Sequence, residues 1–351
     1  LTEGLVQAYV LFRQAQEKIK EVCNFHGTRD LYNMRYQLNA LFEVVTNIEA
    51  PMNVKIGFIV NTVISRNFSG IMSNKLRSEE DFLKIAQQEL SKLLTFKIDL
   101  NDKLIKKTSS LDMIFHNIMD TRARHLMLLC ESSLIEDVVI EQIRRFTVEG
   151  RKKDPKYFAV FRGTRSKEEE FELISSLAVY IQQGYTLILK DLDRVYSCMY
   201  ELLNQRYEVR QGLKGCNLIY DTHKQWVSIN PDFRCIVLAS RQDTVINSQN
   251  AEKIQPPPFL NRFEKQLVME EDILSLDQQG ALKSSITDYI DKESKTKTIL
   301  IHNLSKELLM SLATKDSAIS DKYKLANASS YKDYIGKEFY RLLQPEAQDK
   351  E

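Results

Sequence analysis

Residues with the chemistry to bind and split a nucleoside triphosphate are expected in two loops of this chain, and neither loop has a complete set. A phosphate-binding loop needs glycines, whose backbone N–H groups reach the phosphates, followed by a lysine and a serine or threonine. The loop after the first predicted strand instead reads Cys130-Glu131-Ser132-Ser133, and no Gly-x4-Gly-Lys-Ser/Thr occurs in the chain. Because a carboxylate stands where a triphosphate would lie, we expect this module not to hydrolyse ATP by itself.

The loop after the third predicted strand carries half of the second motif. A competent ATPase of this layout has an Asp that supports magnesium and then a Glu that orients the attacking water. Asp191 takes the first position and is the candidate cofactor-binding residue, but Leu192 takes the second. An alkyl side chain cannot accept a proton. Asp191 is equally compatible with an N-cap role ahead of the helix expected from Val195, so both interpretations stay open.

Cysteines and histidines predict no metal site. The cysteines lack the spacing of structural zinc sites, and their odd number argues against a disulfide framework: Cys23, Cys130, Cys198, Cys216 and Cys235. The histidines lack the spacing of a helical metal pair: His26, His116, His125, His223 and His302. Free thiols fit the reducing cytosol, so we expect a cytoplasmic protein.

The elements that would position these loops follow from the spacing of apolar residues. The first hundred residues read as all-helical, with amphipathic helices across 5–48 broken at 24–27, another across 79–96, and a polar turn at 67–70. Short apolar runs then alternate with helical patterns, which is the signature of a parallel α/β sheet. The predicted strands are 125–130, 157–161, 185–189, 233–239 and 266–269.

Other local signals refine this order. Ser166 and Glu169 have the spacing of a capping box and open a helix that Gly184 ends, and a further helix is expected over 195–207. Segments 218–220 and 225–229 predict a hairpin in which Trp226 is a packing or inter-module residue and not a base-stacking platform. Three prolines at 256–258 should stop regular structure, and the chain after Asp272 reads helical again.

Composition excludes some classes of partner. The chain has 351 residues, 43% of them hydrophobic, and a formal net charge of +1, so no global field favours nucleic acid. The basic cluster at 144–145 and 151–153 reads as a solvated helix end. No run of eighteen apolar residues occurs, so no membrane span is expected. The helical pattern is already under way at Leu1, which suggests a piece of a larger chain.

Segment 257–265 reads Pro257-Pro258-Phe259-Leu260-Asn261-Arg262-Phe263-Glu264-Lys265, with an arginine between aromatics after a rigid stretch. Here the chain resembles the AAA+ core of the mysterin family, giant ubiquitin ligases with dynein-like modules. In that family each large subdomain ends in a segment of the type Pro-x-Leu-Asn-Arg-Phe/Leu-Glu-Lys. The resemblance extends from about residue 20 to 275 and includes segments 27–32, 66–70, 184–207 and 230–234.

The resemblance implies an α/β fold with three parts. Residues 1–105 would be the all-helical lid of a preceding AAA+ module. Residues 106–271 would be a degenerate AAA+ large subdomain with a parallel five-stranded sheet, and 272–351 its own helical lid. The Walker loops of the preceding module would then lie before Leu1.

The resemblance also implies roles for two arginines, the candidate catalytic residues. An arginine in the position of Arg262 points across the module boundary at the neighbour's γ-phosphate, and Arg29 looks like the lid arginine that contacts nucleotide in its own, preceding module. Both would converge on ATP and Mg²⁺ held by that module, with no cofactor in this one. Alternatively, Arg262 pairs with Glu264 or another acid, and Arg29 forms a salt bridge in the surroundings of Asp30.

The implied function is that of a non-hydrolysing ring module of a mysterin-like ubiquitin ligase. Its partners would be neighbouring AAA+ modules of the same chain, and ubiquitin machinery through other domains. The alternative is a protein–protein interaction scaffold without any role in hydrolysis. An exposed Arg262 favours the first hypothesis, and an Arg262 buried in an ion pair favours the second.

Overall fold

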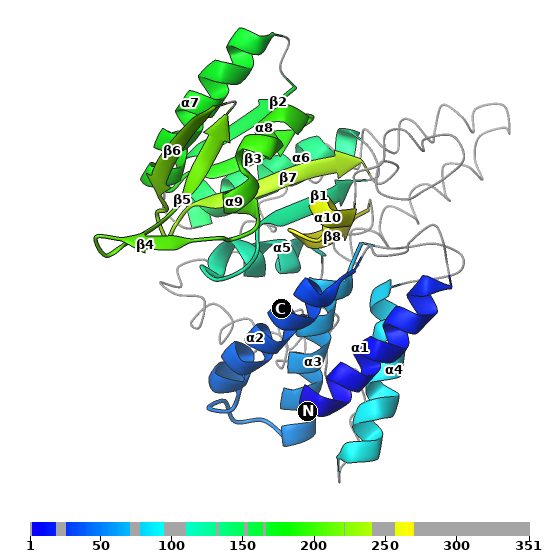
Figure 1. Cartoon of the computed structure of the whole chain (residues 1–351). Helices are drawn as coiled ribbons and strands as arrows, with labels where there is room; N and C mark the ends of the chain where they lie inside the picture. The colour runs from blue at the N-terminus through cyan, green and yellow to red at the C-terminus, as the bar shows by residue number, and fades with distance from the viewer. Residues whose placement is uncertain are drawn as a thin grey trace, which may run out of the picture.

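The computed structural model describes nine segments of the chain (Figure 1): 2–18, 26–70, 78–94, 110–130, 133–150, 154–163, 166–220, 222–240 and 257–269. The predicted helical lid at 272–351, the basic residues 151–153 and the loop residues Glu131 and Ser132 lie outside these segments.

The first four helices pack together as a group below the sheet in Figure 1. They are α1 (Thr2–Glu17), α2 (Thr28–Val45), α3 (Met52–Phe68) and α4 (Ser78–Leu93). Phe12, Phe68 and Phe82 are fully buried and join α1, α3 and α4 through stacked and edge-on ring contacts. The all-helical character predicted for this region is therefore observed in its described part.

Helix α3 differs from the expected pattern. All of its residues from Val54 to Phe68 are buried, because α2 and α4 pack on it and strand β8 (Glu264–Val268) contacts it as well. A helix buried on every side has no amphipathic period to recognise. For the same reason Asn67 and Phe68, which were expected in a turn, continue the helix, and the turn begins only at Ser69.

A parallel sheet of five strands forms the second part, and the α/β fold predicted from the sequence is confirmed. Its strand order is β2-β3-β7-β1-β8, from elements β1 (Leu126–Cys130), β2 (Phe158–Arg162), β3 (Thr186–Lys190), β7 (Arg234–Ser240) and β8 (Glu264–Val268). Each corresponds to a predicted strand. The three central strands are apolar without alternation because helices cover both faces of the sheet.

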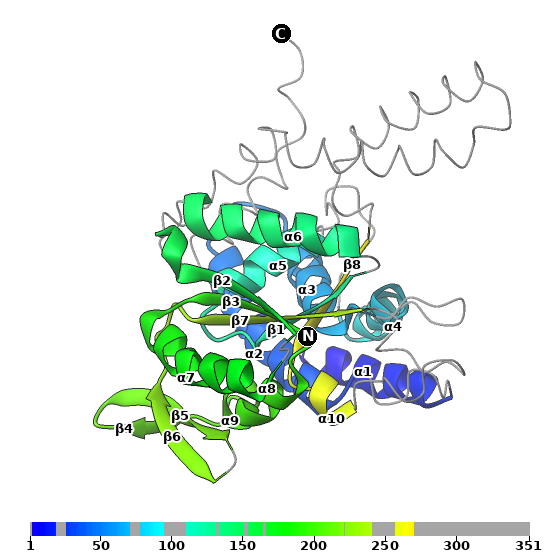
Figure 2. The same cartoon turned by 90° about the horizontal axis from the view of Figure 1, so that it is seen from above.

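Figure 2 shows α5 and α6 on one face of the sheet and α7 and α8 on the other. These helices are α5 (Ser110–Met119), α6 (Ser133–Arg145), α7 (Lys167–Gln183) and α8 (Asp193–Cys198), followed by the single turn α9 (Tyr200–Leu203). A π-helical turn, Phe146–Gly150, extends α6, and a 3-10 turn, Pro155–Tyr157, precedes β2. The expected single helix over 195–207 is thus two short helices that meet at Met199.

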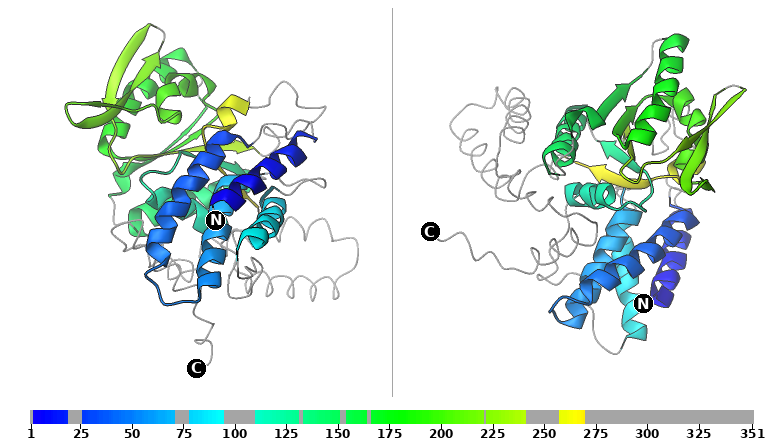
Figure 3. Two further views of the ribbon diagram at one scale, coloured as in Figure 1. Left: turned by 60° about the horizontal axis from the view of Figure 1, so that its bottom comes forward. Right: turned by 90° about the vertical axis from the view of Figure 1, so that its left-hand side faces the viewer.

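A small antiparallel sheet stands beside α7 at the outer edge of the α/β part (Figure 3). It contains β4 (Glu208–Arg210), β5 (Leu213–Tyr220) and β6 (His223–Ser228). The predicted hairpin is present and gains a third strand. Trp226 lies against Gly215, where an added Cβ would be 2.3 Å from the indole, so this tryptophan packs within the sheet as expected.

The proline segment also departs from expectation. Instead of ending regular structure, Pro257 and Pro258 begin the short helix α10 (Pro257–Leu260). Proline is compatible with a first helical turn, because the N–H groups there have no intrahelical partner. Helix α10 leads directly into Arg262 and β8.

The C-terminal cap of α7 gives a first testable prediction. Gly184 has φ +77°, and a Cβ there would be 2.9 Å from the side chain of Asn230. We expect Gly184→Ala to lower the free energy of unfolding by about 1–3 kcal/mol, because both the backbone conformation and the contact oppose a side chain. Urea unfolding of the chain measures this change.

Gly212 provides a matched control. It has φ +79° with nothing within 4 Å of an added Cβ, so Gly212→Ala isolates the backbone contribution and should destabilise less. Equal losses in the two variants would show that the contact with Asn230 is unimportant.

Candidate functional site

The predicted site residues lie at opposite ends of the parallel sheet. Arg262 comes two residues before β8, whose first residue, Glu264, pairs with Leu126 at the start of β1. Asp191 directly follows the last residue of β3. Because five-residue parallel strands are about 16 Å long, Arg262 and Asp191 are separated by the length of the sheet. The structure therefore brings Arg262 near Arg29 but leaves Asp191 elsewhere.

The guanidinium of Arg262 rests on aromatic rings. Its Cζ lies 4.6 Å from the ring centroid of Tyr200 and 5.6 Å from that of Phe259. The side chain is partly buried, and this burial, together with the positive charge of Arg29, lowers the pKa of Arg262. Among the described residues no carboxylate pairs with it, and its expected alternative partner, Glu264, binds Arg66 instead.

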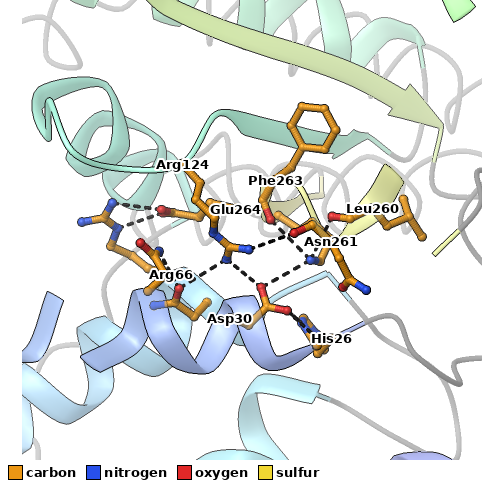
Figure 4. Close-up of polar contacts among 12 residues, drawn as sticks. His26, Asp30, Arg66, Arg124, Leu260, Asn261, Phe263 and Glu264 are labelled. Atoms are coloured by element: carbon orange, nitrogen blue, oxygen red, sulfur yellow. Dashed lines mark hydrogen bonds and ion pairs between the residues drawn. The ribbon is translucent and has the colours of Figure 1, made fainter. Parts of the chain in front are cut away.

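Arg29 lies on the exposed side of the first turn of α2. Its Nη1 donates a hydrogen bond of 2.6 Å to Oδ1 of Asn204, which follows α9. The neighbouring Asp30 turns the other way, into the protein, where Arg124 and Lys265 surround it (Figure 4). In the described part of the chain Arg29 makes no salt bridge of the kind expected as an alternative.

A buried arginine connects the segments that carry the two candidate arginines. Nη2 of Arg124 donates to Oδ1 of Asp30 at 2.6 Å, and Nη1 donates to the carbonyl oxygen of Asn261 at 3.4 Å. Asp30 is next to Arg29, and Asn261 is next to Arg262. The side chain of Asn261 also packs on the backbone of Gly27, where an added Cβ would be only 3.2 Å from it. Arg124 therefore holds the segments that carry Arg29 and Arg262 at a fixed distance from each other.

The contacts of Arg124 belong to a larger buried network (Figure 4). Arg66 of α3 binds both carboxylate oxygens of Glu264 at 2.8 and 3.0 Å and also pairs with Asp120 at 3.3 Å. Three cations therefore face three carboxylates: Arg66, Arg124 and Lys265 against Asp30, Asp120 and Glu264. A buried charge is tolerated only with such partners, so the network joins the helical part firmly to the sheet.

Burial and the charges of the network shift the pKa values of Asp30 and Lys265. Burial alone would raise the pKa of Asp30, but Lys265 and Arg124 beside it lower this pKa to about 2. Burial lowers the pKa of Lys265 to about 8, against the opposing effect of Asp30. Both side chains are therefore charged at neutral pH.

Sequence reasoning missed this network. Its members lie in segments 27–32, 66–70 and 257–265, whose resemblance to a family was noted, and in the residues just before β1. Spacing gave no signal, because the charges that pair are between 54 and 235 residues apart in the chain.

The carboxyl ends of the strands, where a ligand of this sheet would bind, are held by ion pairs. Nζ of Lys190, the last residue of β3, lies 2.6 Å from Glu136 of α6, and Arg162 at the end of β2 pairs with the adjacent Asp137. The buried thiol of Cys130 at the end of β1 has its pKa raised to about 12 by burial and by Glu136. Acidic residues near the start of α6 offset the positive end that such a helix would offer a phosphate.

The Asp191–Leu192 pair is arranged in a specific way at the same edge. Asp191 is exposed and has φ +55°, whereas Leu192 is only 2% exposed. Leu192 is also the N-cap of α8, without a side-chain cap, so the N-cap interpretation of Asp191 was wrong. The position where a water-orienting carboxylate is expected thus holds a buried alkyl group.

Comparison with known proteins agrees with this architecture. Residues 115–274 match the family model described as the RNF213 AAA domain. This part of the chain is therefore similar to the AAA domain of RNF213. RNF213 is also called mysterin, so the family resemblance seen in the sequence is confirmed.

Relatives of the RNF213 AAA family match beyond this domain. Human E3 ubiquitin-protein ligase RNF213 is 24% identical over 285 residues, which cover 76% of this chain and 5% of that protein. Zebrafish E3 ubiquitin-protein ligase rnf213-beta is 26% identical over 253 residues, 70% of this chain and 4% of the relative. Mouse E3 ubiquitin-protein ligase RNF213 is 22% identical over 271 residues, which cover 74% of this chain and 4% of that protein. The chain thus spans about a twentieth of the length of these relatives.

Two further findings concern the described residues of the chain. No group of three or more histidine, cysteine, aspartate or glutamate side chains there is arranged to hold a metal ion. None of the described helices is both long and apolar enough to cross a membrane.

Two buried histidines of the chain, His26 and His125, predict a pH dependence. Burial, followed by the charge of Lys265, lowers the pKa of His26 to about 3, and burial and Arg234 lower that of His125 to about 4. The unfolded chain protonates both near pH 6.5. Between that pH and about 4 only the unfolded state binds these protons, so stability should fall by about 1.4 kcal/mol per pH unit for each histidine.

Urea unfolding of the chain at several pH values between 4.5 and 7.5 measures this slope. His26→Gln and His125→Gln should each flatten it, whereas His223→Gln, on the exposed surface of β6, should not. An unchanged slope in both buried-site variants would refute the assignment.

The ion pair between Lys190 and Glu136 should couple α6 to β3. In a cycle of Lys190→Met, Glu136→Gln and the double variant, we expect an interaction free energy of about 1–3 kcal/mol, because Glu136 is nearly fully buried. The exposed pair Lys84–Asp81, at 3.5 Å, is the control and should give less than about 0.5 kcal/mol. Equal values for the two pairs would show that the Lys190–Glu136 bond does not hold the helix.

Proposed function

We propose that this chain is a non-hydrolysing AAA+ ring module of a mysterin-like ubiquitin ligase, and that it supplies Arg262 as an arginine finger to the ATP site of the preceding module. The ligase chemistry would reside in other domains of the parent protein. The human and zebrafish relatives are E3 ubiquitin-protein ligases, and we propose the same class for the parent protein of this chain.

The observation that carries the proposal is the way Arg262 is held. An arginine with a structural role normally donates its N–H groups to a carboxylate, as Arg66 does to Glu264. Arg262 instead lies on two aromatic rings and makes no ion pair within the described residues. Stacking leaves the five N–H donors of the guanidinium available to an anion. Its partial exposure is intermediate between the two extremes that the sequence hypotheses distinguished.

The position of Arg262 supports a role outside this module. It lies at the amino ends of the strands, whereas a sheet of this type binds its own ligand at the carboxyl ends. Arg29 is near enough for its charge to lower the pKa of Arg262. Two cations held together in this way suit the phosphates of one nucleotide. We infer that the preceding module holds ATP and Mg²⁺ there, with Arg29 as its lid arginine.

The carboxyl end of the sheet supports the non-hydrolysing half of the proposal. The buried Leu192 cannot activate water, and Lys190, which would otherwise be available to a phosphate, is bound to Glu136. Asp191 remains exposed at the same edge and is the candidate cofactor-binding residue of this module. The partners of the module would be neighbouring AAA+ modules, with ubiquitin machinery reached through other domains, and its compartment the cytoplasm.

Arg262→Ala in the full-length parent protein tests the finger. We expect kcat for ATP hydrolysis to fall at least about tenfold, toward the 10³-fold or greater effect of arginine fingers in GTPases, with KM changed much less. The matched control is Arg210→Ala, which removes another arginine that lies on an aromatic ring, Trp226 at 5.5 Å. Its turnover should equal that of the unchanged protein.

The alternative is an interaction scaffold without any role in hydrolysis. Unchanged turnover in Arg262→Ala would favour the scaffold and refute the arginine-finger role of Arg262. Titration of the chain with labelled ATP tests the other half of the proposal, because saturable binding at low micromolar concentration would contradict an empty module.

A further inference from the structure

Helix α9 contacts both candidate arginines. The ring of Tyr200, its first residue, lies under the guanidinium of Arg262, and the side chain of Asn204, its C-cap, accepts the hydrogen bond from Arg29. Residues four apart share one face of a helix. Nδ2 of Asn204 also donates to the carbonyl oxygen of Tyr200 at 2.8 Å, so the two contacts are linked within one turn.

The opposite side of α9 is anchored in the protein. Leu202 and Leu203 are buried, and the carboxylate of Glu201 accepts hydrogen bonds from the backbone and side-chain amides of Asn217 in β5 at 2.8 and 2.7 Å. Gln205, just after the helix, donates to the carbonyl oxygen of Ala123 at 2.9 Å. The turn is therefore a fixed support, and only its outer face reaches the arginines.

Electrostatics explain why an aromatic ring is needed at residue 200. Arg29 repels Arg262, and a guanidinium that is repelled and partly desolvated would otherwise turn away toward solvent. A tyrosine face attracts a cation without a formal charge and without occupying its N–H groups. A carboxylate in the same place would hold the arginine more strongly but would neutralise it. Tyr200 is 39% exposed, so the ring is at the surface where an incoming anion would meet the arginine.

We propose that Tyr200 and Asn204 are positioning residues, Tyr200 for Arg262 and Asn204 for Arg29, so that α9 sets the geometry of both arginines toward the nucleotide of the preceding module. This inference rests on the proposed function. It assigns no contact between α9 and the nucleotide, and it makes the aromatic ring of Tyr200, not its hydroxyl, the essential group.

The test compares three variants of the full-length protein in ATP hydrolysis. Tyr200→Leu should lower kcat about 3- to 30-fold with little change in KM, which is the range that a lost cation–π contact allows. Tyr200→Phe keeps the ring and should restore kcat. Tyr36→Leu is the matched control, because Tyr36 also carries an arginine, Arg122 at 5.8 Å, that is not one of the candidate arginines.

A structural role would not reproduce two further readouts. Tyr200→Leu combined with Arg262→Ala should be no slower than Arg262→Ala alone, since the ring acts through the arginine. Asn204→Ala should raise KM more than it lowers kcat, since it frees the lid arginine. If Tyr200→Leu lowers the melting temperature, Tyr200→Met, unbranched and without a ring, must show the same loss of kcat.

The outcomes separate this inference from the proposed function. No effect of Arg262→Ala would defeat the finger itself. A slow Arg262→Ala together with a Tyr200→Leu variant of normal kcat, or additive losses in the double variant, would leave the finger intact and overturn the role of Tyr200.

Discussion

The pairing of one buried carboxylate with two cations organises the molecule. Asp30 lies in the first turn of α2 and accepts from the N–H of Gly27 at 2.7 Å, so it caps the helix that carries Arg29. The same carboxylate binds Arg124, which precedes β1, and Lys265, which is in β8. Three elements distant in sequence therefore meet at one side chain. Removing one partner of a buried pair typically destabilises by about 3–5 kcal/mol, because it leaves a charge without compensation.

The two ends of the sheet have opposite electrostatic designs. At the carboxyl ends, positive side chains that would suit a phosphate are bound by neighbouring acids, as Lys190 is by Glu136. At the amino ends, the acids are buried beneath the surface and the arginines above them rest on rings or on a neutral amide. Both ends use the same residue types. What differs is that two arginines at the amino ends, Arg29 and Arg262, meet no carboxylate within the described residues.

The sequence was sufficient for the fold, because its strands are short apolar runs bounded by turn signals and their order needed only the parallel α/β pattern. It failed where burial was complete or backbone context decided the outcome. Helix α3 showed no period since every face is covered, and Pro257 was compatible with a helix start. For the site, the family resemblance proposed Arg262 and Arg29, and the position after the third predicted strand proposed Asp191. Tyr200 and Asn204 were not proposed, because their contact with the arginines depends on the return of α9 to the amino ends of the strands.

The distribution of charges in the buried network bears on where this polypeptide can be divided. Asp30 and Arg66 come from the helical part, whereas Arg124, Lys265, Asp120 and Glu264 come from the part that follows residue 105. The boundary expected at residue 105 separates two arrangements of secondary structure. It does not separate two independently stable units, because the ion pairs cross it. A recombinant piece beginning at residue 106 would lack Asp30 and Arg66. These two residues pair with Arg124, Lys265, Asp120 and Glu264, so the piece would expose these four charged groups in an apolar environment. The helices α1 to α4 and the sheet that follows them are therefore expected to fold as one unit.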